Sequence, residues 1–156
     1  MKLSAHFALR TLIHSDTARM RGIDNTPPLR LAKNLTLLAR RLDAVQALLR
    51  HPLEISSGFR SAVLNAEIGG SKTSRHMLGL AADVTCRKFG TPYEVCRRIA
   101  KSTILFDQLI YEFGNRQDGG WIHISFARRA RRRIMTVCLG HQRYRRGLRR
   151  CPKPAP

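Results

Sequence analysis

Residues 74–83 read Ser-Arg-His-Met-Leu-Gly-Leu-Ala-Ala-Asp and place the imidazole of His76 seven residues before the carboxylate of Asp83. The small residues between them would let the chain turn sharply into a strand, expected from Leu80 to Thr85. Neutral imidazoles and ionised carboxylates are good zinc ligands, and three protein ligands leave an open position for water. His123, in Trp-Ile-His-Ile-Ser, is the natural third ligand. The sequence therefore predicts a zinc site.

Each of these residues also has an ordinary structural interpretation. A lone histidine is more often part of a satisfied core, and an aspartate after two alanines can simply cap a turn. The combination favours the metal, because Ser74 precedes His76, Gly79 lies before Asp83, and His123 sits in a later run flanked by aromatic residues.

Length and composition indicate one domain with an ordinary core. The chain has 156 residues, of which 43% are hydrophobic and 6% aromatic. We expect a single α+β domain over residues 1–150, with N-terminal helices packed on a small, mainly antiparallel sheet that carries the zinc cleft, and a disordered tail over residues 151–156. No apolar run approaches the roughly 20 residues of a membrane helix, and no secretory signal peptide is evident, so we expect a cytoplasmic protein.

The elements can be placed along the chain from its periodicity. Two short helices are expected between residues 3 and 21, and a long one from Pro27 to His51, where leucines recur at three and four residues. A strand over residues 53–57 and a helix over residues 91–101 follow. Strand-like runs over 106–113 and 121–126, joined by a loop rich in turn formers, should form a hairpin.

The net charge of +19 predicts an anionic partner, and nucleic acid, anionic lipid and the acidic bacterial wall all qualify. Residues 127–150 contain ten arginines and no acidic residue. This segment is expected to be a basic amphipathic surface for anionic envelopes or membranes, or alternatively a solubilising face or a final packed helix. The four cysteines match no paired zinc motif or disulfide scaffold, and reduced thiols are expected at least while the protein is in the cytoplasm.

A zinc hydrolase also needs a general base and a means of holding its substrate. Glu112 is the leading base, because it lies in an apolar strand-like run that should pair with the run carrying His123. It must then share a sheet face with His123. Asp118, in the loop just before the run that carries His123, is the alternative base. Arg60 follows a strand and a glycine, where a fixed guanidinium would suit recognition of a substrate carboxylate.

Three motifs in order resemble a known superfamily. They are Ser74-x-His76-x-x-Gly79-x-Ala81-x-Asp83, Ser-Gly-Phe-Arg-Ser at residues 57–61, and Trp-Ile-His at residues 121–123. Together they resemble the D-alanyl-D-alanine carboxypeptidase and L-alanyl-D-glutamate endopeptidase superfamily, whose fold hedgehog proteins share, from about residue 3 to 126. The chain is most similar to short zinc peptidases of phages and prophages, which carry the Gly-Ile-Asp-Asn-x-Pro and Phe-Asp-Gln-Leu-Ile segments seen here at residues 22–27 and 106–110.

The resemblance implies zinc bound by the predicted triad, substrate binding by Arg60 and Ser74, and cleavage of amide bonds in peptidoglycan stem peptides or cross-links, of endopeptidase or D,D-carboxypeptidase type. It further implies an endolysin, stored in the host cytoplasm, that acts on the wall once the membrane is opened. We also expect a monomer that binds no specific nucleic acid. One position departs from the pattern: many relatives carry an acid three residues before the second histidine, where this chain has Gly120.

Two other classes of function stay open. A non-catalytic, zinc-bearing wall-binding module would keep the triad and show no hydrolysis, and the missing acid at residue 120 favours it. A basic nucleic-acid binder would explain the charge but not the metal motif.

Overall fold

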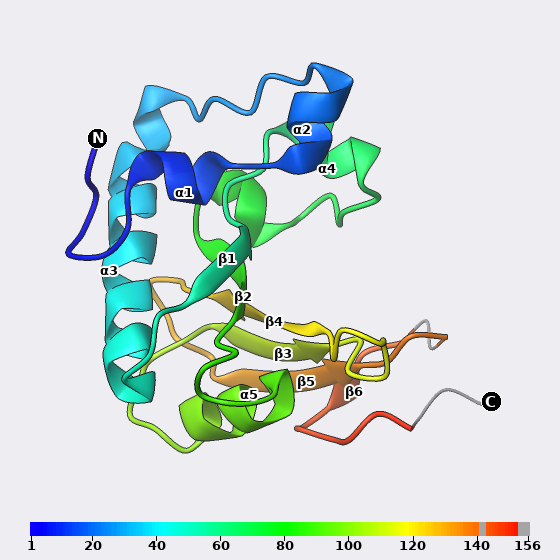
Figure 1. Ribbon diagram of the computed structural model, residues 1–156. Helices are drawn as coiled ribbons and strands as arrows, with labels where there is room; N and C mark the ends of the chain where they lie inside the picture. Colours follow the sequence, from blue (N-terminus) through cyan, green and yellow to red (C-terminus); the bar gives the residue numbers. More distant parts are fainter. Residues whose placement is uncertain (141–142, 153–156) are drawn as a thin grey trace.

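The computed structural model describes residues 1–140 and 143–152 and has the expected α+β architecture (Figure 1). Helices pack on a six-stranded sheet with the strand order β1-β2-β4-β3-β5-β6. The helices are α1 (Leu9–Ile13), α2 (Asp16–Arg21), η1 (Leu29–Leu31), α3 (Ala32–Leu49), α4 (Ala62–Glu67), η2 (Arg75–Leu78) and α5 (Pro92–Ala100). The strands are β1 (Glu54–Ser57), β2 (Ala81–Thr85), β3 (Gln108–Glu112), β4 (Trp121–Ser125), β5 (Arg133–Val137) and β6 (Arg145–Arg146).

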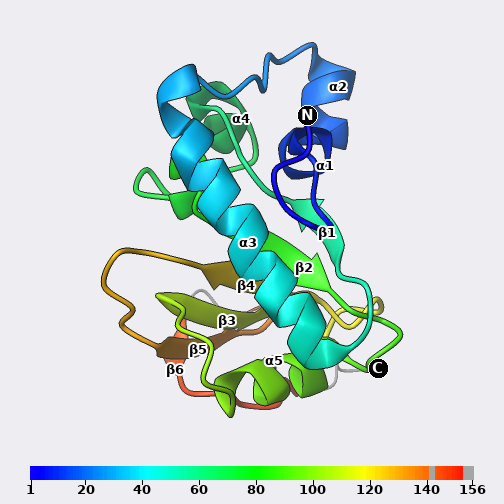
Figure 2. The ribbon, with the colours of Figure 1, turned by 90° about the vertical axis from the view of Figure 1, so that its left-hand side faces the viewer.

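The long helix α3 covers one face of the sheet (Figure 2). Its leucine stripe packs inward, and Leu38 and Leu42 are completely buried. Burying an apolar side chain of this size contributes about 1.5 to 3 kcal/mol relative to leaving it exposed. The helix ends at Arg50, which takes up a left-handed conformation with a φ of 56°. The predicted stripe is thus the surface that joins the helical layer to the sheet.

The second covering helix, α5, begins with a complete capping box. The Thr91 side chain accepts a hydrogen bond from the Glu94 backbone, the Glu94 side chain accepts one from the Thr91 backbone, and Pro92 occupies the first turn. These contacts satisfy backbone donors that a helix start leaves without partners. Val95 and Ile99 then face the core, so α5 packs beside α3 under the sheet.

The central sheet separates an apolar face from a polar one. Strands β2, β4 and β3 pair antiparallel, and the predicted hairpin of β3 and β4 is confirmed. Side chains alternate between faces along a strand, so Val84 and Ile124 point to the buried core while Asp83 and His123 point to the other side. The polar face is the floor of a cleft.

The arginine-rich segment is part of the sheet, not a helix or a free amphipathic segment. Strand β5 pairs in parallel with β3, and β6 pairs antiparallel with β5. Several of its arginines hold the fold together. Arg132 donates to the carbonyl groups of Ala100, Ser102 and Ile104 after α5, and its guanidinium lies 4.7 Å from the centre of the Phe106 ring.

The expectation of four reduced thiols is wrong for two of the cysteines. Cys138, just after β5, and Cys151 form a disulfide, because the turn back through β6 brings their Cα atoms to 5.5 Å. Cys86 and Cys96 are buried. Of the predicted disordered tail, Cys151 is held by this bond, and residues 153–156 lie outside the described residues.

Across residues 1–140 and 143–152, no helix has both the length and the apolar character required to cross a membrane.

Candidate metal and catalytic site

The 3-10 helix η2 delivers His76 to the cleft. The side chain of Ser74 caps this helix by accepting a hydrogen bond from the backbone of His76. The helix stops at Gly79, whose φ of 64° suits glycine, and a side chain there would press on Leu35 of α3. The sharp turn expected between His76 and Asp83 is therefore present, and Gly79 makes it possible.

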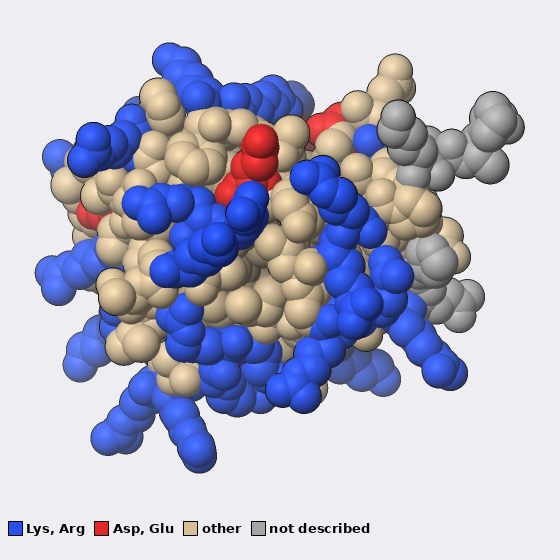
Figure 3. Space-filling view, turned by 90° about the horizontal axis from the view of Figure 1, so that it is seen from below, with Lys and Arg blue, Asp and Glu red and all other residues tan. Residues whose placement is uncertain are grey.

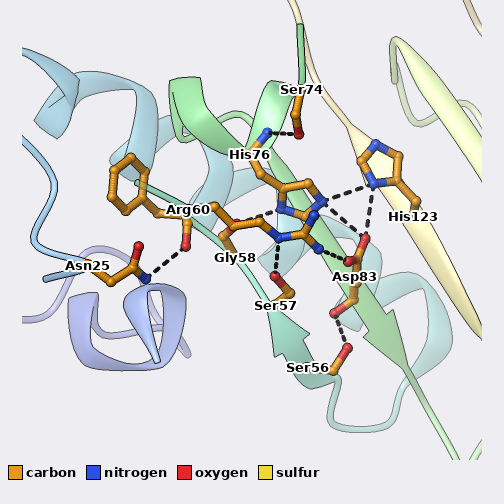
Figure 4. Close-up of polar contacts among 10 residues, drawn as sticks. Asn25, Ser56, Ser57, Gly58, Arg60, Ser74, His76, Asp83 and His123 are labelled. Atoms are coloured by element: carbon orange, nitrogen blue, oxygen red, sulfur yellow. Dashed lines mark hydrogen bonds and ion pairs between the residues drawn. The ribbon is translucent and has the colours of Figure 1, made fainter. Parts of the chain in front are cut away.

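The three predicted ligands converge at one point of the cleft floor (Figure 4). Asp83 and His123 are directly opposite each other on β2 and β4, and His123 Nδ1 lies 3.0 Å from Asp83 Oδ1. His76 Nε2 lies 3.2 Å from the same oxygen and 3.1 Å from His123 Nδ1. Adjacent strands and the short helix η2 thus bring together side chains that are up to 47 residues apart.

This arrangement fits a zinc ion. His76 Nδ1 pairs with the carbonyl oxygen of Gly58, which fixes this ring nitrogen as the donor and leaves Nε2 as a ligand. The separations of 3.0 to 3.2 Å among the three ligand atoms approach the roughly 3.3 Å expected of tetrahedral ligands about 2.0 Å from zinc. Two imidazole nitrogens and one carboxylate oxygen leave a fourth position for water.

The protein keeps the ligand atoms in the protonation states that a metal needs. Burial favours the neutral form of Asp83, but its close contacts with His76 and His123 outweigh this effect and hold the pKa of Asp83 below its usual range. Burial lowers the pKa of His76 and so favours its neutral form, although Asp83 opposes this shift. A deprotonated carboxylate and a neutral imidazole are the forms that bind zinc.

Arg60 is fixed beside this cluster. Its Nε donates to Ser57 Oγ at 2.8 Å and its Nη2 donates to Asp83 Oδ2, while only 14% of its side chain is exposed. It lines the same cleft as His123. The expected immobile guanidinium is present, and its pairing with Asp83 is an additional role that the sequence did not indicate.

A buried asparagine missed by the sequence analysis supports this arginine. The Asn25 side chain donates to the carbonyl groups of Ile13 and Phe59 and accepts a hydrogen bond from the Ser61 backbone. It therefore fixes the backbone on both sides of Arg60, and Figure 4 shows the bond from Asn25 to the carbonyl group that precedes Arg60. The sequence signal that could have identified Asn25 is the Asp-Asn-x-Pro segment, which the sequence analysis used only as part of a resemblance.

Glu112 and Asp118 occupy different surroundings. Glu112 is on β3 with its side chain lining the cleft, and burial together with the charge of Asp83 raises its pKa to about 7. Asp118 has 52% of its side chain exposed and pairs with Arg116, and its backbone hydrogen bond from Gly120 is the main reason that its pKa is lowered. Glu112 thus combines a place in the cleft with a raised pKa, whereas Asp118 is exposed and has a lowered one.

The glycine at position 120 has a steric explanation. Its φ of 71° lies in the left-handed region, and a Cβ there would collide with the backbone carbonyl of Glu112. The backbone in this structure has no room for an acidic side chain at residue 120. The neighbouring strand instead places the carboxyl group of Glu112 in the cleft.

Tyr144 is a second cleft residue that the sequence analysis did not single out. It precedes β6 and lines the cleft together with Glu112. Burial, and then the negative charges of Glu112 and Asp83, raise the pKa of its hydroxyl. No local sequence signal could have placed it there, because its position depends on how the arginine-rich segment pairs with β3.

A cleft with a His-Asp-His cluster, a fixed arginine and a carboxyl group of raised pKa defines a candidate metal-dependent hydrolase. The chain matches the Peptidase M15 family over residues 5–125 and belongs to that family. The family contains zinc-dependent peptidases that act on peptidoglycan, which confirms the resemblance to the carboxypeptidase superfamily. None of the curated proteins compared with the chain matches it significantly.

Proposed function

We propose that the chain hydrolyses an amide bond in the stem peptides or cross-links of peptidoglycan, as an endolysin-like zinc peptidase. The observation that carries this proposal is the convergence of His76, Asp83 and His123 on the cleft floor beside Arg60 and Glu112. Within a family of zinc peptidases, these residues provide a metal site, a substrate-binding cation and a base.

His76, Asp83 and His123 would hold the zinc, which when bound lowers the pKa of a water molecule and polarises the scissile carbonyl group. Glu112 accepts the proton of the attacking water and passes it to the leaving amine. In the metal-free protein, burial raises the pKa of Glu112 to about 7, so its carboxylate accepts a proton more readily than an exposed glutamate does. Arg60 orients the peptide through a carboxylate or carbonyl oxygen, and Ser74 lines the same cleft.

The biological setting that we propose is storage in the host cytoplasm and action on the wall after the membrane is opened. The disulfide between Cys138 and Cys151 supports action outside the cytoplasm, because such bonds persist in oxidising surroundings and are rare in reducing ones. The disulfide would then form, or persist, in the compartment that contains the peptidoglycan.

A basic face beside α5 supports contact with the anionic envelope. Figure 3 shows lysine and arginine side chains across this side of the molecule, with few acidic ones. Arg97 and Arg98 are exposed on α5, and Arg150 reaches the same helix, with its guanidinium 4.5 Å from the centre of the Tyr93 ring. We propose that this face holds the monomeric enzyme near its polymeric substrate by electrostatic attraction.

The test of the main proposal is digestion of purified peptidoglycan by the zinc-loaded protein, followed by mass analysis of the fragments. New amine and carboxyl ends within stem peptides are expected, and their masses identify the bond. The Glu112→Gln variant is the matched control, because it keeps the shape of the side chain and removes the base. Binding to peptidoglycan without any new ends would instead support a non-catalytic wall-binding module.

A further inference from the structure

The cleft continues beyond the catalytic residues to a basic end. Along β3, core residues alternate with Gln108, Ile110 and Glu112, and these three side chains form part of the cleft floor. Strand β5 lies beside β3 and aligns Arg133 with Gln108. Four residues of strand span about 13 Å, so Arg133 lies roughly that far along the floor from Glu112.

Two guanidinium groups lie beside one buried carboxylate at this end. Asp107 is completely buried and accepts hydrogen bonds of 2.6 and 2.7 Å from Arg131. Arg75 Nη2 lies 3.9 Å from Asp107, on the opposite side of the cleft from β5. Arg133 is tied to the same residue through its backbone, which donates to the Asp107 carbonyl oxygen at 2.9 Å.

The charges of this cluster do not cancel. The Asp107 carboxylate lies beside the guanidinium groups of Arg131 and Arg75, and its two short hydrogen bonds pair it mainly with Arg131. The side chain of Arg133 is exposed, and no acidic side chain pairs with it among the described residues. Along the described lining of the cleft, the only acidic side chains are Asp83 and Glu112, at the catalytic end.

An exposed arginine is usually only a solvated cation, but Arg133 differs from most arginines of this chain in two respects. Its backbone is fixed by a sheet and by Asp107, and its side chain lines a cleft that also contains the proposed catalytic residues. A guanidinium group binds a carboxylate strongly because its planar end can offer two parallel N–H donors.

We propose that Arg133, together with Arg75, forms a second subsite of the cleft that binds a carboxylate of the substrate three to four residues from the scissile bond. An extended peptide of that length covers the distance from Glu112 to Arg133. The inference rests on the proposed peptidase function and deepens it, because it makes a negatively charged peptide the preferred substrate. Arg133 lies outside the family match over residues 5–125, whereas Arg75 lies within it.

The experiment compares soluble stem peptides in two forms, with the carboxylates outside the scissile bond either free or converted to carboxamides. Wild type, Arg133→Gln and Arg129→Gln are each assayed for hydrolysis and, by calorimetry, for binding. Arg129 is a matched control, because it is an exposed arginine of the same segment that does not line the cleft. Each variant removes one positive charge.

Wild type should favour the free carboxylate by about 10- to 100-fold in both kcat/KM and affinity, as expected for a charge-assisted hydrogen-bonded pair. Arg133→Gln should abolish most of this preference, and Arg129→Gln should keep it. Equal cleavage of both forms by wild type would overturn the subsite and leave the peptidase function intact.

The binding measurement separates the two proposals. Preferential binding that depends on Arg133, without hydrolysis by zinc-loaded wild type, would support the subsite and contradict the peptidase function. Equal affinity for the two forms, or a preference that Arg133→Gln and Arg129→Gln reduce equally, would overturn the subsite, because only general charge would then be involved.

Discussion

Glu112 and His123 project from the same face of neighbouring strands. Ile110 is the residue directly opposite His123, and Glu112, two positions further along β3, is opposite Trp121. Because side chains alternate, a register shifted by one residue would have turned Glu112 into the core. The condition that the sequence analysis placed on the base is met, and it connects the sheet register with the proposed proton transfer.

The first prediction concerns the metal. His76→Ala and His123→Ala should each lose most of the bound zinc, because removing one of three protein ligands leaves too few for a stable site. Elemental analysis of the purified proteins measures this. His14→Ala, at an exposed histidine near α2, is the control and should keep its zinc. Retention of a full equivalent of zinc by both triad variants would show that the ligands are elsewhere.

The second prediction concerns the base. Glu112→Gln should keep zinc and fold but reduce kcat by about 10²- to 10⁴-fold, the usual contribution of general acid–base catalysis. Asp118→Asn should change kcat only slightly, because Asp118 is exposed and paired with Arg116. Steady-state kinetics on a soluble stem peptide measures both. A large loss for Asp118→Asn alone would identify the loop carboxylate as the base.

The third prediction concerns stability and pH in the metal-free protein. The pKa of Glu112 rises from 4.5 to about 7 on folding, first because of burial and then because of Asp83. Between these values the native state binds more protons than the unfolded state, so Glu112 makes the free energy of unfolding fall as pH rises. Denaturant unfolding of wild type and Glu112→Gln across this range isolates the effect. Relative to the variant, wild type should lose stability with rising pH, and parallel curves would contradict the assignment.

The fourth prediction concerns the disulfide. Reducing the bond between Cys138 and Cys151 should lower the free energy of unfolding by about 3 kcal/mol, because the bond closes a loop of 13 residues and restricts the unfolded chain. Denaturant unfolding with and without reductant measures this. The Cys138→Ser/Cys151→Ser double variant should resemble the reduced protein and respond little to reductant. An equal response of wild type and double variant would exclude this bond as the cause.

The fifth prediction concerns the basic face beside α5. Replacing Arg97, Arg98 and Arg150 with glutamine should weaken binding to cell envelopes and slow their lysis, while turnover of a soluble stem peptide should change little. Raising the salt concentration should act in the same way, because it screens exposed charges. Sedimentation and turbidity assays measure binding and lysis. If lysis and soluble turnover fall together, or if neither responds to salt, the face has no targeting role.

Truncation after Phe126 cannot test targeting by the arginine-rich segment. It would remove β5, the strand that covers one edge of β3, together with the hydrogen bonds from Arg131 to buried Asp107. An unpaired buried carboxylate is strongly destabilising. Loss of lysis by such a variant would therefore reflect loss of the fold, which is why exposed arginines are substituted instead.

The sequence by itself determined the candidate metal ligands and the antiparallel core of the fold. His76 and Asp83 are separated by a short turn that Gly79 permits, and His123 lies in the second strand of a hairpin, so local periodicity and turn residues were sufficient. Only the tertiary structure decided the parallel pairing of β5 with β3, the disulfide of Cys138 with Cys151, and the places of Asn25 and Arg133. These features depend on contacts between distant segments, which leave no local pattern in the sequence. No tight turn specifies the parallel partner of a strand, and the spacing of cysteines does not define their pairing. The many arginines of residues 133–137 and their neighbours also hide the hydrophobic alternation that would indicate a strand.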